Sequence, residues 1–232
     1  MKPDLIITWP RNVEYPLFRQ FVRDSRSNFG KVIIVFTSSG SEIDYSQFVI
    51  NAMSNDDCIF LSSSPILPGE DWRNVAIQDA LKLTTSDWLW FMEQDFLVTD
   101  PAFWDEINEY ITYREVIGVK ENSGRLHPCC LLIRRDTLNR TGCDFGIVQD
   151  QMDHFGLIQS DLEALDVFIT GLTPKYYHHM NGLSHNFHLA STMQEVTYYP
   201  DEFKRYLSGC LTLTGVPLDP RFEKVAKSML LQ

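Results

Sequence analysis

The sequence predicts an α/β fold in which helices cover both faces of a central, mostly parallel sheet. Short apolar runs, typical of strands buried on both faces, alternate along the first half of the chain with segments of helical periodicity. Strands separated by helices of this length form βαβ units, which build parallel sheets. The 232 residues suffice for one such domain, and no linker divides them. We therefore expect a single domain over residues 1–232.

The predicted elements follow one another in a regular order. Strands are expected at the apolar runs 5–8, 32–36, 58–61, 88–92, 116–119 and 130–133. One helix is expected from Tyr15 to a glycine stop at Gly30, and a second from Trp72 onward. A third helix is expected at Pro101, because proline favours the first helical position. After about Gly142 the pattern becomes less regular.

The charge and the cysteines narrow the class of protein. A formal net charge of −11 disfavours binding to nucleic-acid backbones or anionic lipid outside a local basic pocket. No apolar run approaches the roughly 20 residues of a membrane span, and the first strand begins without a signal-peptide pattern. The five cysteines include no CxxC pair, so we expect buried free thiols at Cys58, Cys129 and Cys130. These features predict a cytoplasmic protein without integral membrane association.

An acidic triplet, Glu93-Gln94-Asp95, directly follows the apolar run 88–92. Open α/β sheets bind ligands beyond the carboxyl ends of their strands, so a site is expected on this side. Two carboxylates separated by one residue can lean toward one hard cation, Mn²⁺ or Mg²⁺, which would neutralise a departing diphosphate. Taken alone, however, such a triplet is more often a solvated acidic turn.

The residues around the triplet give it more weight. Trp72-Arg73-Asn74-Val75-Ala76 opens a helix, Ser86-Asp87 precedes the strand, and the strand leads into the triplet. This order resembles the central segment of GT-A glycosyltransferases, in particular nucleotide-diphospho-sugar transferases of the family-2 type, which carry an Arg-Asn pair, a turn, a strand and an Asp-x-Asp motif. The N-terminal strand, ending in Thr8-Trp9-Pro10-Arg11-Asn12, agrees with their nucleotide-binding half.

The resemblance covers residues 4–112 well and the remainder loosely. It implies the Rossmann-like, three-layer α/β/α sandwich of the GT-A fold. It further implies a nucleotide-sugar-binding half over about residues 1–115 and an acceptor-binding half over about residues 116–232.

The resemblance also implies roles for the acidic triplet. Glu93 and Asp95 stand where the family's metal and diphosphate carboxylates stand, with Gln94 between them on the donor side. A glutamate here replaces the usual first aspartate, which lengthens one ligand arm.

Further donor-side positions follow from the same comparison. Thr8, Pro10 and Arg11 fall on the base and ribose side, and Arg73 and Asn74 near the nucleotide. For Arg11 and Arg73, a surface ion pair is the alternative.

The end of the second strand departs from the family pattern. Thr37-Ser38-Ser39 stands where the family often has an acidic residue, so Thr37 becomes the donor-side candidate and the nucleotide base stays open.

A histidine-rich segment places His178, His179, His185 and His188 within 11 residues. In many GT-A enzymes a late histidine completes the metal shell, often with a glycine shortly after it, and His179 with Gly182 resembles that pattern most. His185 is the alternative, and in a strand it would share a face with His179. A zinc site made of histidines alone would leave the acidic triplet without a role.

An inverting transferase also needs a carboxylate base near the acceptor. Ser160-Asp161-Leu162-Glu163 loosely resembles the acidic pair of the family's acceptor region, which makes Asp161 the first candidate and Asp153 the second. The same residues equally suit a plain helix N-terminus with Ser160 as its cap.

Together these features predict a glycosyltransferase of the hexosyltransferase class that uses Mn²⁺ or Mg²⁺ and a nucleotide-diphosphate sugar, with a UDP-sugar as first candidate. The acceptor stays open among a glycan, a protein, a small molecule and a modified nucleic-acid base. One alternative is a sugar nucleotidyltransferase, although residues 8–12 lack the glycine its phosphate loop would need. Another is a catalytically silent nucleotide- or carbohydrate-binding module. The replacement of the usual first aspartate by Glu93 is the feature that suggests it.

Overall fold

A seven-stranded sheet runs through the middle of the molecule in the order β3-β2-β1-β4-β7-β6-β8. All neighbouring strands are parallel except β7, which is antiparallel to both β4 and β6. The strands are β1 (Asp4–Pro10), β2 (Val32–Thr37), β3 (Cys58–Ser62), β4 (Trp88–Met92), β6 (Val116–Lys120), β7 (Leu126–Arg134) and β8 (Ile169–Gly171). The computed structural model describes residues 2–10, 16–37, 46–68, 70–93, 96–98, 100–120, 124–146 and 155–179.

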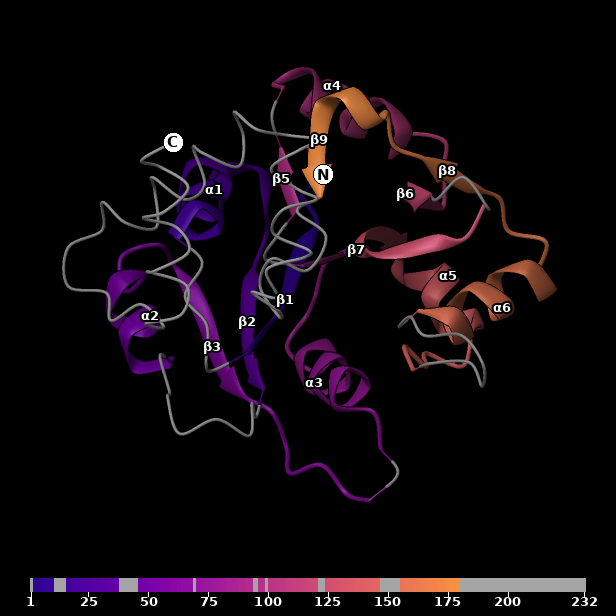
Figure 1. The fold of residues 1–232 in the computed structure, drawn as a ribbon. Coiled ribbons are helices and arrows are strands. Elements are labelled where there is room, and N and C mark those ends of the chain that lie inside the picture. The colour runs from indigo at the N-terminus through magenta and orange to yellow at the C-terminus, as the bar shows by residue number, and fades with distance from the viewer. Residues whose placement is uncertain are drawn as a thin grey trace, which may run out of the picture.

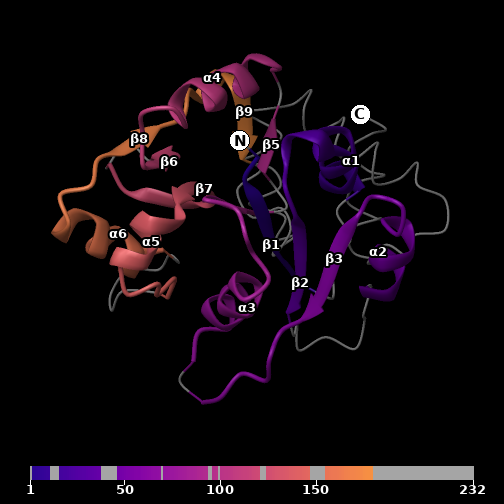
Figure 2. The same ribbon diagram turned by 180° about the vertical axis from the view of Figure 1, so that it is seen from behind.

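Helices cover both faces of this sheet (Figure 1). One face packs against α1 (Pro16–Ser25), α2 (Ser46–Ala52) and α4 (Ala102–Tyr110). The other face packs against α3 (Trp72–Leu81), α5 (Arg135–Arg140) and α6 (Gly156–Ala164). The view from behind again shows α1 and α2 on one side of β1–β3 and α3 on the other (Figure 2). The three-layer α/β/α sandwich predicted from the sequence is therefore confirmed.

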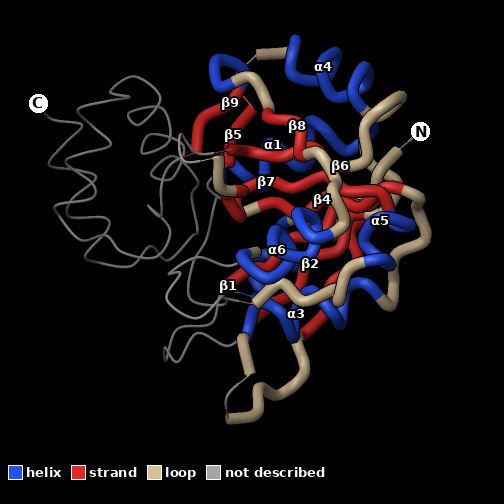
Figure 3. Tube along the Cα trace, turned by 90° about the vertical axis from the view of Figure 1, so that its right-hand side faces the viewer, coloured by secondary structure: helices blue, strands red, loops and turns tan. Residues whose placement is uncertain are grey.

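Smaller elements complete the described chain. The 3-10 turn η1 (Arg26–Asn28) follows α1, and η2 (Pro174–Tyr176) precedes the last described strand. That strand, β9 (Tyr177–His179), pairs antiparallel with β5 (Phe96–Val98) in a separate two-stranded ladder. Figure 3 shows β5 and β9 side by side, and it shows α3 and α6 in front of the sheet.

The central strands are apolar throughout because both of their faces are packed. Along β2, Ile34 and Phe36 enter the cluster on the α1 side, whereas Ile33 and Val35 enter the cluster on the α3 side. All six residues of β2 are buried. A strand covered on both faces has no solvent-facing position for a polar residue, so it appears in the sequence as a continuous apolar run.

The structure corrects the expected start of the helix around Asp161. α6 begins at Gly156, and Phe155 occupies its N-cap position with a left-handed φ of 71°. Ser160 lies inside the helix, where its hydroxyl donates to the Gly156 carbonyl oxygen at 3.0 Å. The prediction of Ser160 as the helix cap is therefore wrong, because the chain reverses at Phe155 and needs no polar cap there.

The amino-terminal edge of the sheet is held by the carboxylate of Asp4, which is 2% exposed. Its Oδ1 accepts from the Lys31 amide at 2.8 Å, and its Oδ2 accepts from the Thr85 and Ser86 amides at 2.6 and 2.9 Å. A Cβ at Gly30 would lie only 2.6 Å from Asp4 Oδ1, so glycine is required there. One carboxylate thus joins the starts of β1 and β2 to the turn before β4.

Four cysteines lie in the described ranges, and all are free thiols. Cys129 and Cys130 are buried, as expected from the sequence, whereas Cys58 is only partly covered. Burial raises the pKa of Cys130 to about 12, even though the Trp90 indole N–H donates to its sulfur at 3.2 Å. A thiol with this pKa stays protonated at neutral pH and is a poor nucleophile.

Among the described helices, none is both long enough and apolar enough to cross a membrane.

We expect Asp4→Asn to lower the free energy of unfolding by about 2–3 kcal/mol, because an asparagine cannot accept from amides on both sides and leaves a buried N–H unpaired. Chemical denaturation measures this change. Asp57→Asn is the matched control: that side chain is 91% exposed and pairs only with Arg26 among the ion pairs of the described residues, so its loss should cost less than about 0.5 kcal/mol. Equal effects of the two substitutions would refute a special role for Asp4.

Candidate functional site

The carboxyl ends of β1, β2 and β4 meet at one edge of the sheet. Pro10 pairs with Thr37 across β1 and β2, and Ile7 pairs with Met92 across β1 and β4. Because β1 and β4 are parallel, the residues that follow this last pair, Thr8 and Glu93, lie at the same level. Four residues predicted to bind the donor are thus brought to this edge by the sheet register.

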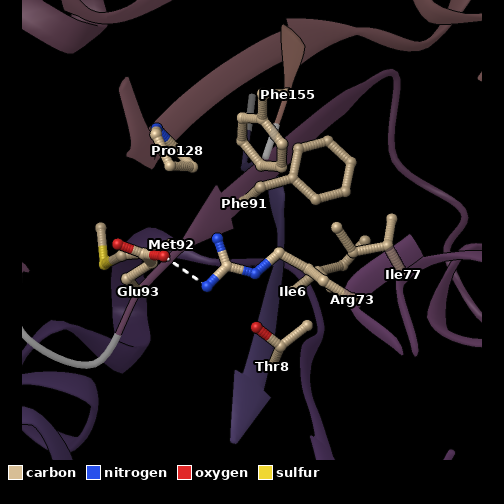
Figure 4. Close-up of a pocket in the computed structure, with 9 residues that line it drawn as sticks. All are labelled: Ile6, Thr8, Arg73, Ile77, Phe91, Met92, Glu93, Pro128 and Phe155. Carbon is tan, nitrogen blue, oxygen red and sulfur yellow. Dashed lines mark ion pairs between the residues drawn. The ribbon is translucent and has the colours of Figure 1, made fainter. Parts of the chain in front are cut away.

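A small cavity of about 10 Å³ lies at this edge, with room for about one water molecule. Arg73 crosses it toward Glu93, with Thr8 on one side and the aromatic rings of Phe91 and Phe155 on the other (Figure 4). The described residues that line it are Ile6, Thr8, Arg73, Ile77, Phe91, Met92, Glu93, Pro128 and Phe155. The cavity therefore combines a cation, an anion and a hydroxyl within apolar walls.

Arg73 and Glu93 form a buried ion pair. Arg73 Nη2 lies 2.5 Å from Glu93 Oε1, and the two side chains are 6% and 15% exposed. The alternative of a surface ion pair for Arg73 is therefore wrong, because both charges are enclosed. The start of α3 holds the arginine in place: Asp71 caps this helix by accepting from the amides of Arg73 and Asn74 at 2.8 and 3.1 Å.

The Arg73 guanidinium keeps unused hydrogen-bond donors. Its Nε and Nη1 atoms are buried and have no hydrogen-bond partner among the described residues. A buried donor without an acceptor costs about 1–3 kcal/mol, so such a group points to a partner that is added later. The charged N–H groups of arginine suit carboxylate and phosphate oxygens best.

Asn74 faces away from this cavity. Its Oδ1 accepts from the Phe145 amide at 3.2 Å, and one turn further along α3 the Gln78 side chain donates to the Cys143 carbonyl oxygen. Asn74 therefore holds the segment at residues 143–145 against α3, and the structure does not place it in the cavity with Arg73.

Thr37 and Pro10 close the ends of β2 and β1. Thr37 is 1% exposed, and its hydroxyl donates to the Trp9 carbonyl oxygen at 3.5 Å. Pro10 is described only by its backbone, which pairs with Thr37. Both residues border the carboxyl edge of the sheet, and Thr37 is not among the described residues that line the cavity.

The structure does not bring Asp161 to Glu93. Phe155, at the start of α6, lines the cavity, and Asp161 follows it by six residues, which is about 9 Å along a helix axis. The carboxylate of Asp161 instead accepts from the Gly142 amide at 2.7 Å. This contact gives Asp161 a structural partner in the segment that leads away from α5.

The backbone of His179 lies close to the triplet in the fold. His179 pairs with Phe96, which immediately follows Asp95 in the sequence. The Phe96 amide donates to the Glu93 carbonyl oxygen at 3.3 Å, and the Phe96 ring stacks on Tyr177 at a centroid distance of 4.9 Å. The β5–β9 ladder therefore connects the end of β4 to the beginning of the histidine-rich segment.

Several predicted site residues lie outside the described ranges: Arg11, Gln94, Asp95, Asp153 and His185. The side chain of His179 is likewise not described. Within the described ranges, no group of three or more histidine, cysteine or carboxylate side chains is arranged to hold a metal ion. Of the four predicted metal ligands, Glu93 is the one whose side chain lies within the described part of the structure.

Sequence reasoning missed three contributors to the site. Asp71 carries a recognisable signal, because an aspartate directly before a helix is a favoured N-cap. Pro128 and Phe155 line the cavity from β7 and the start of α6, and no local pattern marks them because the long-range packing of the two halves puts them there.

No protein-family model matches this chain, and no curated protein matches its sequence. Solved structures do match. The mannosyltransferase PcManGT from Pyrobaculum calidifontis, in complex with GDP-Man and Mn²⁺, is similar over 99% of this chain and 70% of its own, with a TM-score of 0.57 and 11% identity. Glucosyl-3-phosphoglycerate synthase from Mycobacterium tuberculosis, bound to Mn²⁺, UDP and glucosyl-3-phosphoglycerate, matches over 94% and 81%, with a TM-score of 0.53 and 14% identity.

TarS from S. aureus, residues 1–349, matches over 100% of this chain and 71% of its own, with a TM-score of 0.53 and 15% identity. Sequence identities this low show a shared fold and leave activity and substrates open. The strand order, the layers and these similarities agree with the resemblance seen in the sequence: the chain has the GT-A glycosyltransferase fold.

Proposed function

We propose that the protein is a metal-dependent glycosyltransferase that moves a sugar from a nucleotide-diphosphate sugar to an acceptor hydroxyl. The observation that carries this proposal is the buried Arg73–Glu93 pair in the cavity beyond β1 and β4. It places an anion-binding and a cation-binding group together at the edge where open α/β sheets bind ligands. A nucleoside diphosphate with its divalent cation is a ligand that carries both charges.

The cation site is proposed to consist of Glu93, Asp95 and one late histidine. Carboxylate and imidazole ligands suit Mn²⁺, and carboxylates with water suit Mg²⁺. The pairing of His179 with Phe96 favours His179 over His185, because it keeps the His179 backbone near the triplet. When bound, the cation would neutralise the charge that develops on the departing diphosphate.

The chain's own groups would bind the rest of the donor. We propose that Arg73 uses its unpartnered N–H groups on phosphate oxygens, with the Thr8 hydroxyl beside it in the same cavity. Pro10, Arg11 and Thr37 follow the carboxyl ends of β1 and β2 and are proposed to border the base and ribose, with Gln94 next to the phosphates. The matched structures bound to GDP-Man or UDP support this class of donor, with UDP or GDP as the nucleotide.

The base is the part of the proposal that the fold constrains least. A base must come within hydrogen-bond reach of the acceptor hydroxyl. Because the Asp161 carboxylate is engaged by the Gly142 amide away from the cavity, we favour Asp153 for this role if the enzyme inverts the sugar.

Donor hydrolysis tests the proposal directly. We expect the protein with Mn²⁺ to hydrolyse at least one of a panel of UDP- and GDP-sugars slowly, because a bound donor is attacked by water when no acceptor is present. Asp95→Ala should lower this rate at least about 100-fold, as expected when a charge-stabilising group is lost. Asp105→Ala, an exposed aspartate on α4, is the matched control and should leave the rate unchanged.

If no donor is turned over and Asp95→Ala leaves nucleotide affinity unchanged, the enzyme proposal fails. Nucleotide binding without turnover would instead indicate a silent binding module.

Asn74→Ala separates a donor-binding role from a structural one. Because Asn74 accepts from the buried Phe145 amide, its loss should cost about 1–3 kcal/mol of unfolding free energy. It should also speed hydrogen exchange in the peptide around Phe145, while the KM for the donor stays the same. Asn51→Ala, at an exposed position of α2, is the control for both measurements. A raised donor KM with unchanged hydrogen exchange would return Asn74 to the donor site.

A further inference from the structure

We infer that Arg73 is an internal counterion that occupies Glu93 until an anionic ligand draws it away, so that anion binding and cation binding are coupled through this pair. The inference deepens the proposed function and depends on it for the identity of the two ligands. Its physical basis, the buried pair with its unused donors, stands independently.

The first step is the competition for Glu93. Arg73 Nη2 lies 2.5 Å from Glu93 Oε1, in a place where both side chains are largely enclosed. A guanidinium does not lose its proton in a protein, so its positive charge is permanent. A divalent cation that approaches Glu93 therefore meets a fixed positive charge already paired with the carboxylate, in surroundings that screen it poorly.

The second step is the space available. The cavity holds about 10 Å³, roughly one water molecule, and Arg73 Nε and Nη1 are buried, so a phosphate group cannot reach these two nitrogens while the arginine spans the cavity. Apolar walls from Phe91, Phe155 and Pro128 enclose one side and offer no polar substitute (Figure 4). Binding of an anion by these nitrogens thus requires Arg73 to move.

The third step is the reason for the arginine to move. Nε and Nη1 have no hydrogen-bond partner in the part of the chain that the structure describes, although the side chain is buried. An anionic group would supply acceptors for these donors and a counter-charge for the guanidinium. The arginine can then leave Glu93 without remaining an unpaired buried charge, and its positive charge no longer opposes a cation at the carboxylate.

Such an exchange makes the two ligands interdependent. If the bound anion raises the affinity for the cation by some factor, the bound cation raises the affinity for the anion by the same factor, because coupling free energies are reciprocal. The protein without a donor should consequently hold a divalent cation weakly. This property distinguishes the pair from a cation site that is preformed.

The test measures binding of Mn²⁺ alone to the full chain by titration calorimetry or by the EPR signal of free Mn²⁺. Arg73→Met removes the competing charge with similar volume, and we expect it to tighten Mn²⁺ binding about tenfold or more, within the usual range of coupling between sites. Arg73→Lys keeps the charge and should stay near the wild type. Arg23→Met, which breaks the Arg23–Asp56 ion pair elsewhere on the surface, is the matched control and should have no effect.

Glu93→Gln completes a double-mutant cycle. If Arg73 acts by occupying Glu93, Arg73→Met should tighten Mn²⁺ binding in the wild-type background and leave it unchanged in the Glu93→Gln background. A similar gain in both backgrounds would mean a general electrostatic effect and would overturn the inference. So would unchanged or weaker Mn²⁺ binding in a folded Arg73→Met variant, with folding checked by circular dichroism.

If the Arg73→Met variant does not fold, the Glu93→Gln variant alone still tests the counterion role of Arg73. The freed arginine should then bind UDP more tightly in the presence of EDTA, and unchanged UDP affinity would overturn the inference. These outcomes are independent of donor hydrolysis. If the donor is turned over but Arg73→Met does not tighten Mn²⁺ binding, the proposed function stands and the counterion role of Arg73 is refuted. If Arg73→Met tightens Mn²⁺ binding but no donor is turned over, the counterion role stands and the proposed function is refuted.

Discussion

The carboxylate of Asp4 is the constraint on which the arrangement of the central strands depends. Its two oxygens accept from Lys31 on one side and from Thr85 and Ser86 on the other. These bonds hold the starting level of β1, β2 and β4, and a fixed start in parallel strands fixes their register further along. The alignment of Thr8 with Glu93 at the far edge is therefore a consequence of hydrogen bonds made about a strand length away.

Charge is distributed differently at the two edges of the sheet. At the amino-terminal edge, buried polar groups are satisfied: Asp4 accepts from three amides, and Arg135 donates to the Ser86 carbonyl oxygen and to the Thr84 hydroxyl at 2.8 and 2.9 Å. At the carboxyl edge, Arg73 is buried with two nitrogens unpartnered. Among the described residues, Arg114 Nε and Thr170 Oγ1 also lack a partner, but only Arg73 combines two such nitrogens with a place in the cavity beyond β1 and β4. Because folded proteins satisfy buried polar groups almost everywhere, this guanidinium marks the edge where a ligand is proposed to bind.

The second half of the chain contributes walls to the site. β7 returns antiparallel beside β4, and the Glu93 amide donates to the Cys129 carbonyl oxygen at 2.9 Å, next to Pro128. α6 begins directly after Phe155, whose ring packs against Phe91. Stability and function therefore share the same contacts, because the packing that buries the β4 face also narrows the cavity around Arg73.

The apolar runs in the sequence by themselves determined the central strands, since a strand packed on both faces must be apolar at every position. They also determined where Glu93 lies, because it directly follows such a strand. Short elements such as α2, α5 and β8 escaped prediction because they depend on contacts with distant segments more than on their own periodicity. The local sequence likewise gave the wrong start for the helix that contains Ser160 and Asp161. That helix begins at Gly156, directly after Phe155.

Only the tertiary structure decided that Arg73 and Glu93, separated by 20 positions in the sequence, form one buried pair. The sequence placed each at a promising position but carried no information about the distance between them. That distance follows from the register of β1 with β4 and from the capped start of α3, both of which arise from long-range hydrogen bonds and packing.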